Sequence, residues 1–594
     1  MITLLLACGN MGSVVIDGPP DEVPEAERDD DEDGFVAEED CDDEDPLSFP
    51  GGDEGTAPDG ADNDCDGVVD DYEVGCGGVT DVIMDAVDLV DDGMTILVCP
   101  GHYPEDLVLD GRELTILSME GAGETYIDGS GDTSVVSLTG ADITLTGFTI
   151  SGGLAENGGG VYAMDSELTL SENVIEDNVA TQYGGGVYTQ STGADILDNT
   201  VEDNDAFEGG GLYVWGQVTL QGNEILENHC VSLQEGEAYH GADGGGGGLF
   251  ARGKVDILDN VIARNVSEVN GAGVYTLDAS GTFSGNLVKA NETYEDGSGV
   301  YANYTSETYD NNEFIDNFAH DDAGGLRIYV GSAEITNNYF EGNGCNDDGG
   351  GLKLSHARST VSGNTFVDNY AGDSGGALEL DNDVSPVSDC VFEDNRAARG
   401  AAINAKELFS ATTLTDLTFI DNEASSSGGA IYMYDNPYTL TAKRIVVERG
   451  DAPFGAAIAA SAASVVVRNA LITGQDGDAI ELTGSTGSFG NIVITDSTGT
   501  GIVSDGAYTL YNSILVNNEI GVEGPATVSY STFWDNDILG DNADGTGVIY
   551  EDPDFTASYE LESSSPCIDA GTPSVNDPDG SRSDMGYYGG PDAP

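Results

Sequence analysis

Six positions near the N-terminus have the spacing of a calcium-binding loop. Residues 62–73 fit D-x-D-x-D-G-x5-E, in which alternate carboxylates converge on one ion because the chain wraps around it. Gly67 permits the sharp turn, and an all-oxygen ligand set favours calcium over zinc or copper. The predicted ligands are Asp62, Asp64, Asp66, the carbonyl of Val68, Asp70 and Glu73.

A second stretch, residues 29–40, matches the same pattern less well because Ala37 replaces the ninth-position ligand. The sequence around both stretches is rich in Gly and Pro, so we expect calcium loops without flanking EF-hand helices. The weaker predicted ligands are Asp29, Asp31, Asp33 and Asp40.

Catalytic residues are harder to find because acids are everywhere. The 594 residues include 110 Asp and Glu against 17 Lys and Arg, a formal charge of −93, so paired carboxylates carry almost no information. His229, His240 and Asp243 lie in one insertion and could hold a metal, but a solvated loop is the preferred interpretation. No catalytic constellation is predicted.

The charge also restricts the partners. It argues against binding nucleic acid or an anionic membrane surface by simple electrostatics, and it makes divalent cations natural ligands. Hydrophobic residues make up 39% of the chain, enough for a core, and no apolar run is long enough to span a membrane.

The elements that position these residues come from a repeat with a period near 26. Short strand-like runs alternate with Gly and Asn, which excludes helical repeats, and no leucine-dominated unit is present. Three short strands and three turns per coil remain, so we predict an all-β fold, a parallel β-helix of about 18 coils. The second asparagine of the repeat falls at Asn178, Asn204, Asn228, Asn265, Asn291, Asn317, Asn343, Asn369, Asn395 and Asn422.

Stacked coils place equivalent residues above one another. Asparagines suit the bends because they tolerate left-handed backbone geometry, and their amides can bond to the amides of neighbouring coils. A first asparagine ladder runs from Asn173 to Asn364, five residues before the other. The predicted interior column is Ile175, Val201, Ile225, Ile262, Val288, Phe314, Phe340, Phe366, Phe392 and Phe419.

The N-terminal end of the repeat is predicted to carry a short amphipathic helix. Ile83, Ala86, Val87 and Val90 share one face, with Thr80 or Asp81 as cap and Gly93 as terminator. This helix would cover the open first coil, because an exposed strand edge invites aggregation. Strands are expected at 95–99 and 114–118, and a disulfide between Cys76 and Cys99 is expected to flank the helix.

One outward position of the coil is aromatic six times in succession and then basic at Arg327 and Lys353. Such a stripe could stack on sugar rings or a partner protein, but a structural ladder covered by loops is the favoured interpretation. The stripe residues are Tyr162, Tyr188, Tyr213, Phe250, Tyr275 and Tyr301.

Several segments resemble known bacterial families. The repeat resembles the pectin-lyase-like right-handed β-helix superfamily, and its GGAI (428–431) and FIDN (314–317, 419–422) motifs are similar to those of polymorphic outer membrane proteins. Residues 40–73 resemble the MopE-type metal-binding motif of surface proteins, without one cysteine usual there. The segments SPCIDAG (565–571) and DMGYYGG (584–590) resemble the closing segment of secreted β-helix proteins.

The first residues resemble a bacterial lipobox, Leu5-Leu-Ala-Cys8, without the basic region that usually precedes it, which implies acylation of Cys8. We therefore expect a secreted or outer-membrane lipoprotein at the cell surface, acting in adhesion or cell-envelope interaction. The alternative is an extracellular polysaccharide lyase or glycosidase. The expected division is signal and lipobox 1–8, acidic linker 9–39, calcium segment 40–75, β-helix 76–545 and closing segment 546–594.

Overall fold

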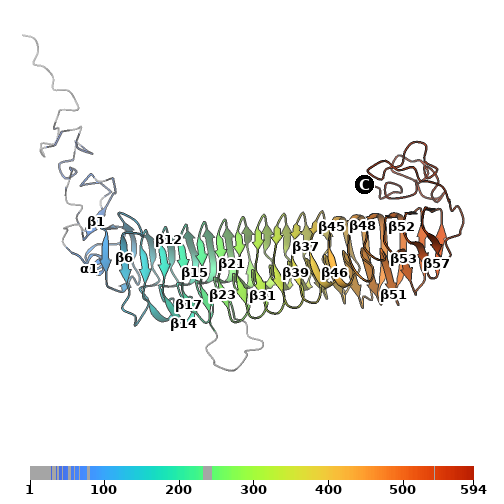
Figure 1. Ribbon diagram of the computed structural model, residues 1–594. Coiled ribbons are helices and arrows are strands. Elements are labelled where there is room, and N and C mark those ends of the chain that lie inside the picture. The colour runs from blue at the N-terminus through green and yellow to red at the C-terminus, as the bar shows by residue number, and fades with distance from the viewer. Residues whose placement is uncertain are drawn as a thin grey trace, which may run out of the picture.

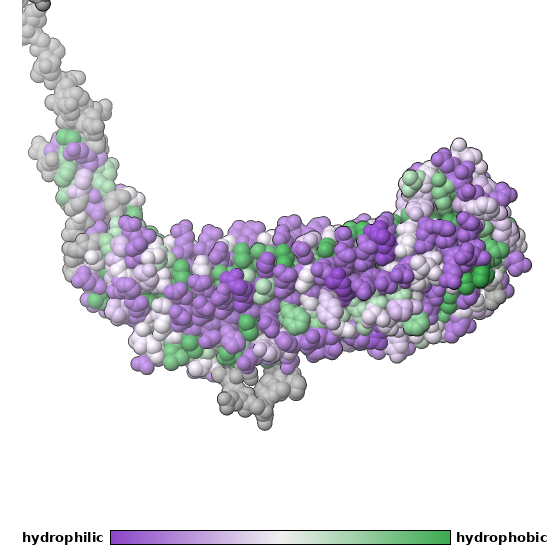
Figure 2. Space-filling model, in the orientation of Figure 1, coloured by the Kyte–Doolittle hydropathy of each residue, from purple (hydrophilic) through white to green (hydrophobic). Residues whose placement is uncertain are grey.

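The protein is a long rod built of stacked coils (Figure 1). The computed structural model describes residues 29, 35–36, 39–42, 45–50, 52, 55, 57–58, 60–65, 67–75, 80–231, 244–540 and 542–594. Its named strands pair in parallel from β1 (Asp71–Val74) to β59 (Ile538–Gly540), which confirms the predicted parallel β-helix. Figure 2 shows a mainly hydrophilic surface along the visible face of the rod.

Three strand columns, and a fourth between the first and the second of them, run along the central coils. The first contains β11 (Val161–Met164), β15 (Val187–Leu197), β18 (Leu212–Gln221), β21 (Leu249–Leu258), β24 (Val274–Ser280), β28 (Val300–Thr305), β32 (Leu326–Gly331), β36 (Leu352–Ala357), β40 (Leu378–Asp381), β44 (Ile403–Lys406) and β47 (Ile431–Tyr434). The second contains β13 (Val174–Glu176), β16 (Thr200–Glu202), β19 (Glu224–Leu226), β22 (Val261–Ala263), β26 (Leu287–Lys289), β30 (Glu313–Ile315), β34 (Tyr339–Glu341), β38 (Thr365–Val367), β42 (Val391–Glu393) and β45 (Thr412–Ile420). The third, a separate 11-stranded sheet, begins with β10 (Leu154–Asn157) and β14 (Val179–Tyr183) and ends with β46 (Glu423–Ser427). The fourth contains β12 (Glu167–Ser171), β25 (Thr282–Ser284), β29 (Thr308–Asp310), β33 (Glu334–Thr336), β37 (Thr360–Ser362) and β41 (Val387–Ser388), and it continues through parts of β15, β18, β21 and β45.

The interior column lies where the repeat predicts it. Its ten residues pair in register from Ile175 to Phe419 and are fully buried. From Phe314 onward the rings stack with centroids 4.7–5.0 Å apart, close to the spacing of neighbouring strands. Each ring therefore fills the coil and shields the ring below from water.

The asparagines form two buried ladders. In the ladder from Asn178 to Asn422, each Nδ2 donates to Oδ1 of the next asparagine at 2.9–3.1 Å. The expected left-handed geometry, however, does not fall on them. It falls on the preceding residue, as at Asp177 and Asp203 (φ 53° each), because the asparagine must point inward while its neighbour makes the bend.

The predicted helix is present as α1 (Ile83–Leu89), which packs against β1, β2 (Thr95–Val98) and β4 (Leu107–Val108). Its first two amides, of Ile83 and Met84, donate to the carboxylate of Glu105 at 2.8 and 2.9 Å. The predicted cap, Thr80 or Asp81, was wrong, because Val82 occupies the N-cap position and makes no side-chain hydrogen bond there. The carboxylate of Glu105, 22 residues after Ile83, accepts the hydrogen bonds from the first helical amides instead.

The C-terminal segment does not continue the coils. After β59 it folds back beside β48 (Thr439–Glu448), β50 (Ser464–Thr473), β52 (Thr486–Thr495) and β55 (Ile514–Val516) (Figure 1). Outward apolar residues there, Leu471, Val493 and Ile514, pack against Met585 and Tyr587. The segment thus covers an apolar strip on the side of the rod. In the described part of the chain, no helix is both long and apolar enough to cross a membrane.

Candidate functional site

The aromatic stripe forms one stacked ladder outside the core. Tyr162, Tyr188, Tyr213, Phe250, Tyr275 and Tyr301 pair in register along β11, β15, β18, β21, β24 and β28. Neighbouring rings stack with centroids 4.5–5.4 Å apart. Within that range each ring occupies the face of the next, so the faces are not open to a sugar.

Burial leads to the same conclusion. Phe250 and Tyr275 are 1% exposed, and Tyr188, Tyr213 and Tyr301 are 7% exposed. Burial also raises the pKa of the Tyr213 and Tyr301 hydroxyls well above the usual value. Five of the six rings are therefore covered, and Tyr162, at the end of the ladder, is half-buried. The ladder is not the open stacking surface that the sequence also allowed.

Beside the middle of the ladder lies an open groove of about 400 Å³. Tyr213 and Phe250 line it, as does Tyr304, which has 57% of its surface exposed. The remaining lining residues are Tyr183, Glu208, Arg252, Leu277 and Asp278. The groove combines aromatic surface with a hydrogen-bond donor, Arg252, and with two carboxylate acceptors, Glu208 and Asp278.

The polar part of the groove is pre-arranged. Arg252 pairs with Asp278 at 2.9 Å, and its guanidinium lies 5.1 Å from the centroid of the Trp215 ring. Trp215 is 38% exposed, so one ring face rests on Arg252 while the side chain still reaches solvent. An exposed ring held in place by a cation is pre-organised for stacking on a ligand.

Sequence reasoning missed this groove. Trp215 and Arg252 occupy the outward position two residues after the ladder, since side chains two apart lie on the same face of a strand. That position reads Met164, Gln190, Trp215, Arg252, Leu277 and Asn303, which is too varied to stand out as a repeat. The groove position could have been found by examining the residue two places after each residue of the aromatic stripe, because it lies on the same face of the strand.

Beyond Tyr301 the same column becomes ionic. The Arg327 guanidinium lies 5.5 Å from the Tyr301 ring and pairs with Asp296 at 2.6 Å and Asp322 at 2.9 Å. In the next coil Lys353 pairs with Asp322 at 2.6 Å. Each cation therefore sits between carboxylates supplied by loops of neighbouring coils.

The ionic column ends at a buried carboxyl. Glu379 has no exposed surface, accepts hydrogen bonds from Asn404 at 2.8 and 2.9 Å, and lies 3.4 Å from Lys406. Burial, helped by the nearby charge of Asp348, raises the pKa of Glu379 to about 7. Although burial opposes its charge, Glu379 and Asp348 raise the pKa of Lys406 above its usual value. A permanently protonated Lys406 is a poor general base.

The stronger calcium loop is partly described, since Asp66 lies outside the described residues. Gly67 has φ +99° as the turn requires, and its amide donates to Asp62 Oδ2 at 3.1 Å. The other oxygen, Asp62 Oδ1, is enclosed and accepts no hydrogen bond from the described residues. Asp70 Oδ1 accepts from the Gly60 amide at 2.9 Å, while Glu73 lies in β1.

The loop carboxylates are not gathered around one point. No three of them among the described residues come within 4.8 Å of one another. An enclosed carboxylate oxygen without a donor fits a cation site, so Asp62 is the residue of this loop that could hold the predicted calcium. Of the weaker set, Asp29 and Asp40 are described, whereas Asp31 and Asp33 lie outside the described residues.

Disulfides hold the same region. Cys41 and Cys65 are bonded, with Cα atoms 5.5 Å apart, a pairing the sequence left open. The bond holds Cys65, the fourth position of the predicted calcium loop, against Cys41. The two sulfurs lie near Asp40, but sulfurs in a disulfide are not metal ligands. Cys99 also forms a disulfide. Its predicted partner Cys76 lies outside the described residues, as does Cys8.

Comparison with known proteins places the fold. No curated protein matches the chain. The family model described as right handed beta helix region matches residues 134–317 and 288–445, together more than half of the sequence. These matches cover the aromatic ladder, the groove and the ionic column. The chain belongs to the right-handed beta helix family.

Proposed function

We propose that this protein is a bacterial surface protein that acts in adhesion or cell-envelope interaction by binding a glycan in the groove beside the aromatic ladder. The observation that carries the proposal is the exposed ring of Tyr304, which lines the groove together with the paired Arg252 and Asp278. The exposed ring of Trp215 lies beside the groove, against the guanidinium of Arg252. Sugars are bound by stacking on such rings and by hydrogen bonds to such groups. A net charge of −93 favours neutral over anionic glycans.

A glycan array probed with the full chain tests this function. Trp215→Ala and Tyr304→Ala should each lower the affinity for the selected glycan about tenfold, because one stacked ring contributes about 1–2 kcal/mol. Trp534→Ala and Tyr434→Ala are matched controls, since these rings are 40% and 46% exposed elsewhere on the rod. Equal glycan affinities for the groove variants and the control variants would show that the glycan does not bind in the groove.

The acidic segment is proposed to bind calcium and to act as the neck that joins rod and anchor. Support comes from the sharp turn at Gly67 and from the enclosed oxygen of Asp62. Calcium would neutralise part of the local charge and order the loop. Calorimetry should show calcium binding that Asp62→Asn weakens at least tenfold and that the exposed control Asp110→Asn leaves unchanged. Equal binding by both variants would place calcium elsewhere.

We further propose surface localisation through an acylated Cys8. The disulfide between Cys41 and Cys65 supports an oxidising compartment outside the cytoplasm. Metabolic labelling with a fatty acid should mark the natural protein and not its Cys8→Ser variant. Label retained in that variant would argue against this anchor.

A second candidate is a polysaccharide lyase or glycosidase. Glu379 gives it one point of support, because a carboxyl with a pKa of about 7 can act as a general acid. Its complete burial among Asn404, Ser374 and Lys406 speaks against contact with a polymer. Incubation with uronate polymers, followed in the ultraviolet, would reveal the unsaturated product of a lyase, and reducing-end release would reveal a glycosidase.

A further inference from the structure

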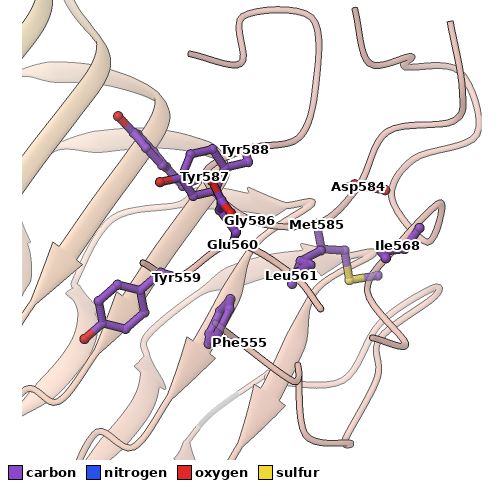
Figure 3. Close-up of a pocket in the computed structure, with 10 residues that line it drawn as sticks. All are labelled: Phe555, Tyr559, Glu560, Leu561, Ile568, Asp584, Met585, Gly586, Tyr587 and Tyr588. Atoms are coloured by element: carbon purple, nitrogen blue, oxygen red, sulfur yellow. The ribbon is translucent and has the colours of Figure 1, made fainter. Parts of the chain in front are cut away.

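A second cavity, of about 300 Å³, lies within the folded-back C-terminal segment, far along the rod from the groove (Figures 1 and 3). Two stretches of that segment form it, residues 555–561 and 584–588, with Ile568 between them. Cys567 and Met585, buried beside it, hold the segment against β52 and β55. The cavity is thus built on a fixed support.

Aromatic side chains form its walls. Phe555 and Tyr559 meet edge to face with centroids 5.7 Å apart, and Tyr587 and Tyr588 do so at 4.8 Å. In Figure 3 the first pair lies below the second. The Tyr588 hydroxyl donates to the Ser558 carbonyl at 3.2 Å, which ties the two stretches together.

The charged side chains that line the cavity are acidic. Glu560 and Asp584 line it, and no basic side chain of the described residues does. Burial and the nearby Glu560 carboxylate both raise the pKa of Tyr588, so that carboxylate acts on the ring's hydroxyl. The basic residues of this region are engaged elsewhere: Arg444 pairs with Asp416, Lys443 with Asp592, and Arg582 donates to backbone carbonyls.

We propose that this cavity binds an organic ammonium group, with a quaternary ammonium as the best fit. Aromatic faces attract such a cation through their negative quadrupole, and a neighbouring carboxylate adds Coulombic attraction. An anion would meet only like charge. A hard metal ion would find two carboxylates among rings, too few oxygen ligands to replace its water.

Choline is the probe, and 3,3-dimethyl-1-butanol is its uncharged isostere. With the full chain in calorimetry, choline should bind at least tenfold more tightly than the isostere. Glu560→Gln and Tyr588→Leu should each weaken choline binding at least fivefold. Tyr588→Phe keeps the ring but loses the hydrogen bond to Ser558, and it should still bind choline more tightly than Tyr588→Leu does. Glu562→Gln should retain the affinity, because Glu562 is an exposed acid two residues from Glu560 that does not line the cavity.

Two results would overturn the site. Equal affinity for choline and its isostere would show that charge is not recognised. Choline binding unchanged in both Glu560→Gln and Tyr588→Leu would assign it to general attraction by the acidic surface. Glu560 is exposed, so its substitution leaves the fold intact. Sedimentation with phosphatidylcholine vesicles distinguishes the source: binding indicates a lipid headgroup, whereas choline binding without it indicates a free small molecule.

Discussion

The outward column that begins at Tyr162 has an aromatic half and an ionic half, and the side chains of the two halves contact their neighbours in different ways. From Tyr162 to Tyr301 aromatic rings stack on one another, whereas from Arg327 to Lys353 cations are held between carboxylates from the loops. The rings need only the residue above and below. The cations need Asp296, Asp322 and Asp348, which recur at the same place in successive coils.

The difference shows that a position in the coil determines the spacing between equivalent side chains but not whether they are aromatic or charged. Strand spacing suits a stacked ring, and it also suits a cation shared by two loops. The aromatic half is robust, because a lost ring removes one contact on each side. The ionic half is less tolerant, because removing one charge leaves others buried without a partner.

Lys353→Met tests the ionic half and should have the largest effect. Lys353 is 3% exposed and pairs with Asp322 and Asp348 at 2.6 and 3.3 Å. Its loss should lower the free energy of unfolding by about 3–5 kcal/mol. Urea unfolding followed by tyrosine fluorescence measures the change, and a loss below about 1 kcal/mol would contradict the comparison.

Glu379→Gln should change how stability depends on pH. The carboxyl titrates near 4.5 when unfolded and at about 7 when folded, so the folded protein binds more protons between these values. The wild type should therefore lose about 3 kcal/mol relative to the variant as pH rises from 4.5 to 7, with no further change above. Unfolding at pH 5 and pH 8 checks this. A difference independent of pH would show that Glu379 titrates normally.

Tyr275→Leu tests the aromatic half and should cost less. The ring is 1% exposed and stacks on Phe250 and Tyr301, but a leucine still fills most of the space. We expect a loss of about 1–2 kcal/mol in unfolding free energy. A loss equal to that of Lys353→Met would remove the distinction between the two halves.

Arg396→Ala removes an ion pair that lies at the surface of the rod. Arg396 pairs with Asp368 at 2.8 Å across neighbouring coils, yet both side chains are more than half exposed. Water screens such a pair, so the change should be below about 1 kcal/mol and should shrink further in salt. A salt-independent loss as large as that of Lys353→Met would mean that burial is not the deciding factor.

The repeat could be predicted because it is local and redundant. A period of 26 fixed the positions of Phe314, Asn317 and their equivalents, and an error in one coil is corrected by the next. The bend residues were assigned one place too late, since an asparagine and its aspartate neighbour have similar propensities. Which of them points inward is decided only by packing.

Contacts between distant parts of the chain could not be predicted. The helix cap from Glu105 and the C-terminal segment folded against Leu471 each join residues that no period relates. The groove lined by Arg252 and Tyr304 is an intermediate case, because the period of two marks the outward position of Arg252 but not which side chains stay exposed around it.

Measuring glycan affinity and unfolding free energy together on two variants distinguishes a structural ladder from a binding groove beside it. Tyr304→Ala should abolish most glycan binding while leaving the unfolding free energy unchanged. Tyr275→Leu should lower the unfolding free energy while leaving glycan affinity unchanged. The reverse outcome, with binding lost on altering the buried ring and kept on altering the exposed one, would contradict the account.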